Sequence, residues 1–140
     1  MRRVLGVGID LCLVLAFVLI GRASHHDGGG LAGLASTAWP FVTGLAAGEI
    51  VTRGWRRPAA LLPTGIGVWL STVAVGMVLR VVAGQGTAAP FIAVALAFLG
   101  FFLLGWRLVV GRVPALRALL EPPSAEGPSA YPALGARRAD

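Results

Sequence analysis

One aspartate, Asp10, interrupts the first long apolar run of this 140-residue chain. A carboxylate inside a membrane helix is costly, so it marks either a functional group or a structural hydrogen bond to a neighbouring helix. Its expected partner is Glu49 or Arg107 reaching inward. For Glu49, the sequence favours an ion pair with Arg53 four residues later. Proton or cation handling by Glu49 is the alternative.

Candidate ligand-binding side chains follow the first apolar run and end the third. The stretch Gly21–His25 reads Gly-Arg-Ala-Ser-His, and Trp39 follows it beside a proline and a phenylalanine. Arg80 lies near the end of the third run. We expect Arg22, His25, Trp39 and Arg80 to edge an outward vestibule for a small anionic or carboxylate ligand, because guanidinium groups bind such anions. For Arg80, the alternative is a side chain that snorkels to the membrane surface.

The third apolar run carries one more candidate, Trp69. Helical spacing places Trp69, Thr72, Gly76 and Arg80 on one face. Gly76 would let another helix approach this face closely. Trp69 therefore belongs with the candidate binding or transport residues.

No metal, cofactor or catalytic site is expected. Adjacent histidines such as His25 and His26 point in different directions on a helix, and no recognised metal-ligand spacing is present. The single cysteine, Cys12, lies within the first apolar run and reads as a helix-packing residue. Because no nucleophile–base pair is visible, the sequence does not favour an enzyme.

The composition indicates an integral membrane protein. The chain is 56% hydrophobic and only 13% charged, about half the charged fraction of a soluble domain, and its apolar residues form long runs. The net charge of +6 does not indicate nucleic-acid binding, because the basic residues, all arginine, lie mostly at the ends of apolar runs.

These runs predict an all-α protein with four transmembrane helices. The expected spans are about 4–21, 31–52, 59–83 and 88–110. Residues 113–140 are rich in Pro, Ala and Arg and predict a disordered tail, whose first part could extend the fourth helix along the surface. The first span could instead be a signal peptide, but Asp10 within it and the lack of a clean cleavage site favour retention.

Two features of the second run bear on packing. Pro40 predicts either that the helix starts near Thr37, with the proline in its first turn, or that residues 31–38 form a short interfacial or re-entrant piece. Gly44 and Gly48 form a small-residue face for close helix contact, which makes a homodimer one expectation.

Arginine placement predicts the orientation. With the N-terminus in the cytoplasm, only Arg22 and Arg80 lie outside. The arginines then lying inside are Arg2, Arg3, Arg53, Arg56, Arg57, Arg107, Arg112, Arg117, Arg137 and Arg138. We therefore expect a multi-pass protein of the cell membrane with both termini in the cytoplasm.

Several motifs together resemble one known family. They are Asp10 in the first span, Gly-Arg-Ala-Ser-His at its exit, Trp39-Pro40-Phe41, Trp55, the Trp69 face, and Gly105-Trp106-Arg107. The combination resembles a family of small bacterial membrane proteins of unknown function (domain of unknown function 3054). The resemblance covers roughly residues 4–112 and implies a four-helix membrane domain without an assigned activity.

Three classes of function are compatible with this pattern. The first is a small solute or ion transporter, with Asp10 as the intramembrane switch and Arg22, His25 and Arg80 at the outer vestibule. The second is a non-catalytic envelope assembly or interaction factor, whose arginines contact a partner or anionic lipid. The third, an intramembrane enzyme, ranks last. The sequence ranks the transporter slightly above the assembly factor.

Overall fold

The computed structural model describes residues 2–25 and 30–120, and in these ranges every regular element is a helix. This confirms the predicted all-α class. The elements are α1 (Arg2–His25), α2 (Gly30–Thr52), the short helices η1 (Gly54–Arg56) and η2 (Leu61–Gly65), α3 (Ile66–Val82), α4 (Ala89–Arg112) and α5 (Pro114–Leu120).

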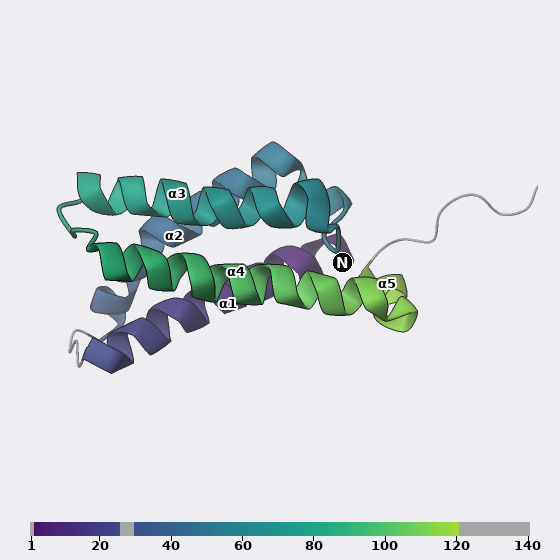
Figure 1. Cartoon of the computed structure of the whole chain (residues 1–140), viewed down its shortest axis with the longest axis horizontal. Coiled ribbons are helices and arrows are strands. Elements are labelled where there is room, and N and C mark those ends of the chain that lie inside the picture. Colours follow the sequence, from purple (N-terminus) through teal and green to yellow (C-terminus); the bar gives the residue numbers. More distant parts are fainter. Residues whose placement is uncertain (1, 26–29, 121–140) are drawn as a thin grey trace, which may run out of the picture.

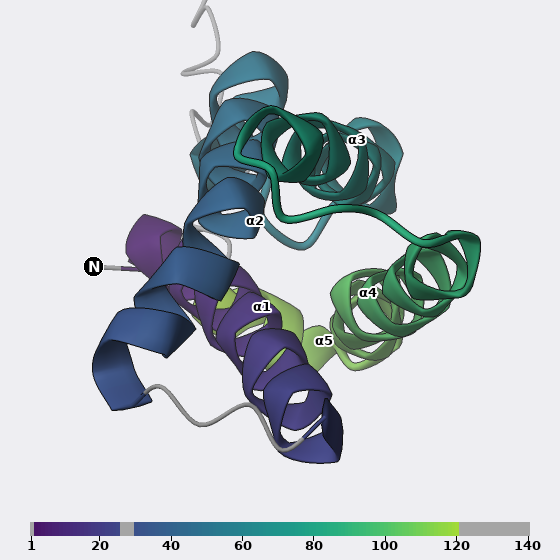
Figure 2. The ribbon, with the colours of Figure 1, turned by 90° about the vertical axis from the view of Figure 1, so that its left-hand side faces the viewer.

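The four long helices run back and forth between two ends of the molecule. Helix α1 starts at the marked N-terminus, α2 returns toward that end, and α3 and α4 repeat the pattern (Figure 1). Figure 2, turned by 90° so that the left-hand end of Figure 1 faces the viewer, shows the four helices around a shared interior. We call the end where α1 and α3 stop the turn end, and the end that carries the α2–α3 connection and α5 the α5 end.

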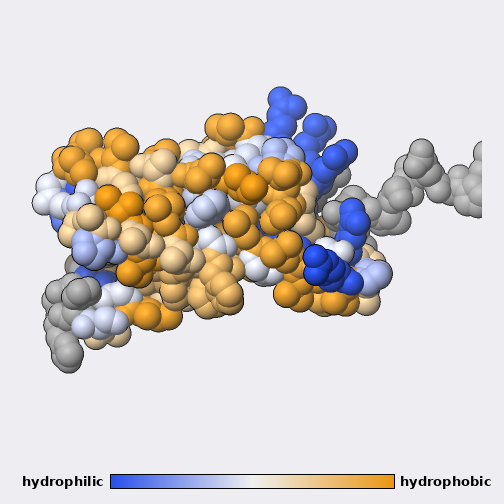
Figure 3. Space-filling view, viewed as in Figure 1, coloured by the Kyte–Doolittle hydropathy of each residue, from blue (hydrophilic) through white to orange (hydrophobic). Residues whose placement is uncertain are grey.

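Three stretches of the described chain are helical, long and apolar enough to cross a membrane: Val4–Ser24, Leu61–Val82 and Ala89–Arg112. Helix α2 has 23 residues but is not among them, because small and polar residues dilute its apolar ones. Large apolar side chains are exposed along the bundle, and they colour much of its body orange in Figure 3. An exposed apolar surface of this extent is compatible with a membrane protein.

The main apolar core is shared by all four long helices. Its fully buried members include Val14 on α1, Phe41 on α2, Val68 on α3 and Leu99 on α4. The rings of Phe17 and Phe41 meet edge to face with their centroids 5.4 Å apart. This core separates the two polar regions described below.

Helices α2 and α3 form the closest helix pair, as the predicted small-residue face requires. A Cβ added to Gly44 would lie 2.8 Å from the Thr72 carbonyl oxygen, and one added to Gly48 would lie 2.9 Å from the Val68 Cα atom. The Ser71 hydroxyl donates a 2.9 Å hydrogen bond to the Gly44 carbonyl. Because Gly44 and Gly48 are buried within the chain, they do not present this face to a second copy.

The predicted helix start near Thr37, with Pro40 in the first turn, was wrong. Helix α2 begins at Gly30 and continues through Pro40 to Thr52, so the proline lies in the helix interior. Its missing N–H leaves the carbonyl of residue 36 without its usual partner. A side chain from the α3–α4 connection satisfies that carbonyl, as described below.

The chain after α4 folds back onto the bundle. Val113 has an extended backbone, with φ −112° and ψ 100°, and therefore ends α4 instead of extending it. Helix α5 follows and buries Leu120 against Ala59 and Val110. The first residues of the predicted tail are thus helical, and residues 121–140 lie outside the described part.

Candidate functional site

Asp10 and Arg107 form a buried ion pair near the α5 end. The Nη1 atom of Arg107 donates to Oδ1 of Asp10 at 2.9 Å, and Nη2 donates to Oδ2 at 2.5 Å. Both side chains have no exposed surface. The indole nitrogen of Trp106 adds a 2.8 Å hydrogen bond to Oδ1. The inward-reaching Arg107 expected from the sequence is therefore the partner of Asp10.

The other donors of Arg107 tie three further segments to this pair. Its Nε donates to the Pro58 carbonyl at 3.0 Å, and Nη1 also donates to the Leu103 carbonyl at 2.8 Å. Its guanidinium carbon lies 4.6 Å from the centre of the Trp106 ring, within cation–π range. A buried guanidinium is tolerated only when its donors are satisfied, and these contacts provide that.

Glu49 is the third ionisable member of the cluster. Its Oε1 lies 3.8 Å from Nη2 of Arg107, and its side chain is 7% exposed. Its Oε2 is buried and has no hydrogen-bond partner. The predicted ion pair with Arg53 was wrong: Arg53 lies beyond the end of α2 in a left-handed conformation with φ 52°, and Glu49 turns inward instead.

Glycines make room for the ion cluster, by which we mean Asp10, Glu49, Trp106 and Arg107. A Cβ added to Gly54 would lie 2.0 Å from Oε2 of Glu49, and one added to Gly65 would lie 2.8 Å from Cδ of Arg107. A third, Gly6, allows Pro58 to pack against α1. The sequence around the α2–α3 connection is therefore shaped to enclose the cluster.

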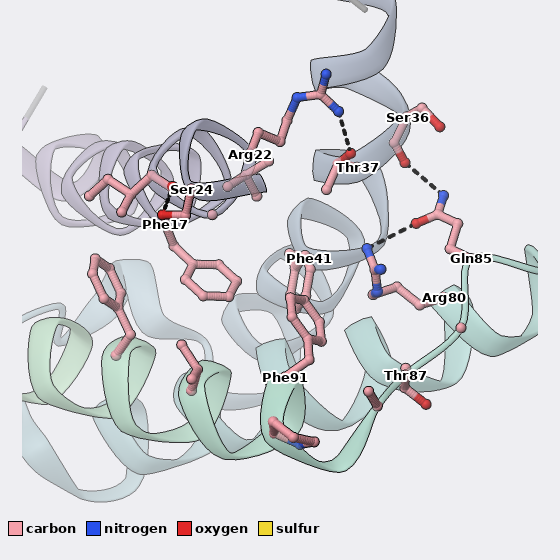
Figure 4. Close-up of a pocket in the computed structure, with 18 residues that line it drawn as sticks. Phe17, Arg22, Ser24, Ser36, Thr37, Phe41, Arg80, Gln85, Thr87 and Phe91 are labelled. Atoms are coloured by element: carbon pink, nitrogen blue, oxygen red, sulfur yellow. Dashed lines mark hydrogen bonds between the residues drawn. The ribbon is translucent and has the colours of Figure 1, made fainter. Parts of the chain in front are cut away.

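A cavity of about 910 Å³ opens at the opposite, turn end. Figure 4 shows Arg22 and Arg80 reaching toward it from α1 and α3, with aromatic rings beside them. We call this space the arginine cavity. Its polar side chains are Arg22, Ser24, Ser36, Thr37, Arg80, Gln85 and Thr87, and its aromatic ones are Phe17, Phe41, Phe91 and Phe98.

Arg80 is held over aromatic rings instead of snorkelling away. Its guanidinium carbon lies 4.6 Å from the centre of the Phe91 ring and 6.0 Å from that of Phe41. Its Nη1 donates to Oε1 of Gln85 at 3.1 Å, while Nε is buried without a partner. The side chain thus keeps donor capacity inside the cavity.

Pro40 accounts for the position of Gln85. A proline has no N–H, so the Ser36 carbonyl four residues earlier lacks its helical hydrogen bond. Gln85 Nε2 donates to that carbonyl at 2.7 Å, and its Oε1 accepts from Arg80 (Figure 4). The helix defect in α2 therefore orients Arg80 through one amide side chain.

Arg22 spans from α1 to the first turns of α2. Its Nη1 donates to the Gly33 carbonyl and to the Thr37 hydroxyl, both at 3.1 Å. An added Cβ at Gly33 would lie 2.6 Å from Nη2 of Arg22, so the guanidinium group would have to shift to admit it. Arg22 and Arg80 thus line one cavity, as the sequence predicted.

The remaining predicted residues lie elsewhere. Trp39 is 42% exposed on α2 and does not line the arginine cavity. Trp69 joins α3 to α4, because its Nε1 donates to the Leu96 carbonyl at 3.1 Å and its ring packs on Gly100. His25 ends α1, and its side chain lies outside the described part.

The candidate residues therefore divide between two sites. Asp10 and Glu49 belong to the ion cluster, whereas Arg22 and Arg80 belong to the arginine cavity. Sequence reasoning missed Gln85, although a proline inside an apolar run signals a carbonyl that needs a new donor. In the described ranges no group of three His, Cys, Asp or Glu side chains could hold a metal.

Comparison with known proteins identifies one family. Its model, described as a protein of unknown function (DUF3054), matches residues 7–110, which is more than half of the chain. Comparisons with curated proteins and with solved structures found no match. The matched range contains both the ion cluster and the residues of the arginine cavity, and the chain belongs to the DUF3054 family.

Proposed function

We propose that this protein is a non-catalytic membrane carrier for small amphipathic anions, such as medium-chain carboxylates. The single observation that carries the proposal is the contrast between the two ends of one bundle. One end holds an open cavity with two arginines, and the other is closed by a buried ion cluster. A carrier that alternates its access needs one open and one closed end in each state.

The proposal includes four spans with both termini in the cytoplasm of a cell membrane. Helix α2 would cross the membrane in addition to the three apolar spans, and its contact with α3 would shield one of its faces from lipid. The α5 end carries Arg53, Arg56, Arg57, Arg112 and Arg117, whereas the turn end carries Arg22 and Arg80. Arginine bias supports placing the α5 end in the cytoplasm. The arginine cavity would then face outward.

The lining of the cavity supports an anion with an apolar body. Arg22 and Arg80 offer guanidinium donors, and Arg80 Nε is free of a protein partner. Four phenylalanines form the apolar wall beside them. In a site partly shielded from water, a carboxylate gains from charge-assisted hydrogen bonds, and its hydrocarbon gains from contact with the rings.

The path beyond the cavity is closed in this state. Phe17 of the cavity wall lies seven residues from Asp10 along α1, about 10 Å at 1.5 Å per residue. Between them Val14, Leu99 and Leu103 are completely buried. Opening this end would require separating Asp10 from Arg107, so the ion cluster would act as an inner gate.

Binding of radiolabelled octanoate to the purified protein tests the ligand class. We expect saturable binding of the labelled octanoate. An excess of unlabelled octanoate should displace it, whereas octanol and octylamine should not. Arg80→Gln should weaken binding by about tenfold or more, because it removes a charge-assisted contact. Arg53→Gln is the matched control, since it removes an exposed arginine at the other end.

Flux into liposomes tests transport separately from binding. Asp10→Asn removes one charge of this gate, so it should change the rate of octanoate flux and leave binding intact, when assayed at a temperature where the variant stays folded. Binding without any flux in the unaltered protein would overturn the carrier and favour a receptor or assembly role. Equal binding of octanol and octanoate would overturn the anion class.

A further inference from the structure

A second pocket, of about 730 Å³, lies at the α5 end and is bordered by arginines from three segments. Arg56 and Arg57 come from the α2–α3 connection, Arg112 ends α4, and Arg117 lies in α5. We call it the basic pocket. It is separate from the arginine cavity, and the carrier proposal assigns it no role.

Within the described ranges no carboxylate balances the charges of Arg56, Arg57 and Arg112 in this pocket. The only carboxylates described there are Asp10 and Glu49, and both are buried beside Arg107. Arg56, Arg57 and Arg112 are exposed. Folding brings these like charges to one depression, which is unfavourable unless an anion neutralises them.

The rim of the pocket is apolar on the side of the bundle. Leu61 and Leu108 line it, and Leu108 is 45% exposed. Figure 3 shows hydrophilic side chains gathered at this end of the molecule, directly beside the hydrophobic surface of the bundle. A ligand at this border would meet positive charge on one side and an apolar surface on the other.

We propose that the basic pocket binds the phosphate headgroup of an anionic phospholipid. Arginine forks match phosphate oxygens in geometry and charge, and Leu61 and Leu108 would contact the acyl chains. In the orientation proposed above, the pocket faces the inner leaflet, where basic side chains attract anionic lipid.

The pocket is also connected to the ion cluster. Arg107 reaches its floor, and Arg107 Nε donates to the carbonyl of Pro58, which directly follows Arg57. A lipid held by Arg56 and Arg57 therefore restrains the segment that encloses the cluster. Such a ligand stabilises the state with the α5 end closed, because it binds that arrangement preferentially.

Thermal unfolding of the full chain in a neutral detergent tests the site, with short-chain lipids as probes. Dioctanoyl phosphatidylglycerol should raise the melting temperature in a saturable manner, whereas dioctanoyl phosphatidylcholine should not. The double variant Arg57→Gln/Arg112→Gln should weaken the apparent affinity about twenty-five-fold, at about fivefold for each arginine. Arg53→Gln is the matched control, because Arg53 lies in the same connection but does not line the pocket.

Each alternative result would overturn the lipid site. Equal stabilisation by inorganic phosphate alone would indicate a soluble phosphate ligand. An equal loss in Arg53→Gln would indicate attraction to net charge without a defined site. If the double variant fails to fold, the single variants Arg57→Gln and Arg112→Gln, at exposed positions, replace it. Each should lose about fivefold in apparent affinity. An unchanged affinity in both would count against the site. Phosphatidylglycerol retained in native mass spectra of the unaltered protein, and lost from the variants, gives a second readout.

Discussion

Asp10 and Arg107 lie 97 positions apart in the chain, yet their side chains form a bidentate ion pair that is completely buried. A buried ion pair is not necessarily stabilising in itself, because desolvation offsets much of the attraction. Its consequence is specificity. Only a packing that brings α1 against α4 at this depth satisfies both groups.

Removing one member of this pair should be more damaging than removing both. Asp10→Asn leaves the Arg107 guanidinium buried without its counter-charge, which should lower the free energy of unfolding by about 3–5 kcal/mol. The double variant Asp10→Asn/Arg107→Gln removes both charges and should lose less. Melting temperatures in detergent provide the comparison. A double variant less stable than Asp10→Asn would contradict this account.

Gly54 should be required because of Glu49. The substitution Gly54→Ala places a methyl group where Oε2 of Glu49 lies, with only 2.0 Å between them, so the carboxylate must move away from Arg107. We expect a loss of about 1–3 kcal/mol, the usual cost of overpacking. In a Glu49→Ala background the same substitution should have little effect, because the obstacle is gone.

A double-mutant cycle with Gly54→Ala and Glu49→Ala measures this coupling by thermal unfolding. The matched control is Gly111→Ala, since a Cβ there meets no atom within 4 Å. If Gly54→Ala lowers the stability equally with and without the Glu49 side chain, Gly54 is required for its backbone conformation and not for the space that it leaves to Glu49.

The sequence alone located the chemistry but not all of its connections. Intramembrane charge is rare enough that Asp10 and Arg107 could be proposed as partners without a structure. The direction of Glu49 could not be read in the same way, because spacing along a helix favoured Arg53. The choice depends on how the chain leaves α2, where Arg53 has a left-handed backbone and Glu49 lies against Arg107 instead.

Pro40 illustrates the other limit. Its local rule, a missing N–H, is visible in the sequence, and it led us to expect a helix boundary. Tertiary structure overrides that rule here, because Gln85 from a distant connection supplies the donor that the helix lacks. Such a long-range repair cannot be inferred from local patterns, although the need for it can.

The contact between Gln85 and the Ser36 carbonyl should therefore depend on Pro40. Gln85→Ala leaves that carbonyl without a donor and should lower stability by about 1–3 kcal/mol. In a Pro40→Ala background residue 40 regains its N–H and can satisfy the carbonyl, so Gln85→Ala should be milder. Thermal unfolding of the four proteins in the cycle checks this, and additive effects would show that the two positions act separately.

The glycines of α2 distinguish packing within one chain from contact between copies. Gly48→Leu forces a large side chain against the α3 backbone, where even a Cβ would lie 2.9 Å from the Val68 Cα atom, so it should unfold or strongly destabilise the protein. Gly8→Leu is the matched control, because a Cβ at Gly8 meets no atom within 4 Å, and it should retain the fold.

Light scattering in detergent, measured beside the melting temperature, separates packing within one chain from contact between copies. If Gly48→Leu keeps its melting temperature while an oligomer dissociates, Gly48 lies between copies and its burial against α3 does not describe the functional assembly. If it loses its melting transition at every protein concentration, the α2–α3 contact belongs to the protomer, because the stability of an interface between copies would depend on concentration.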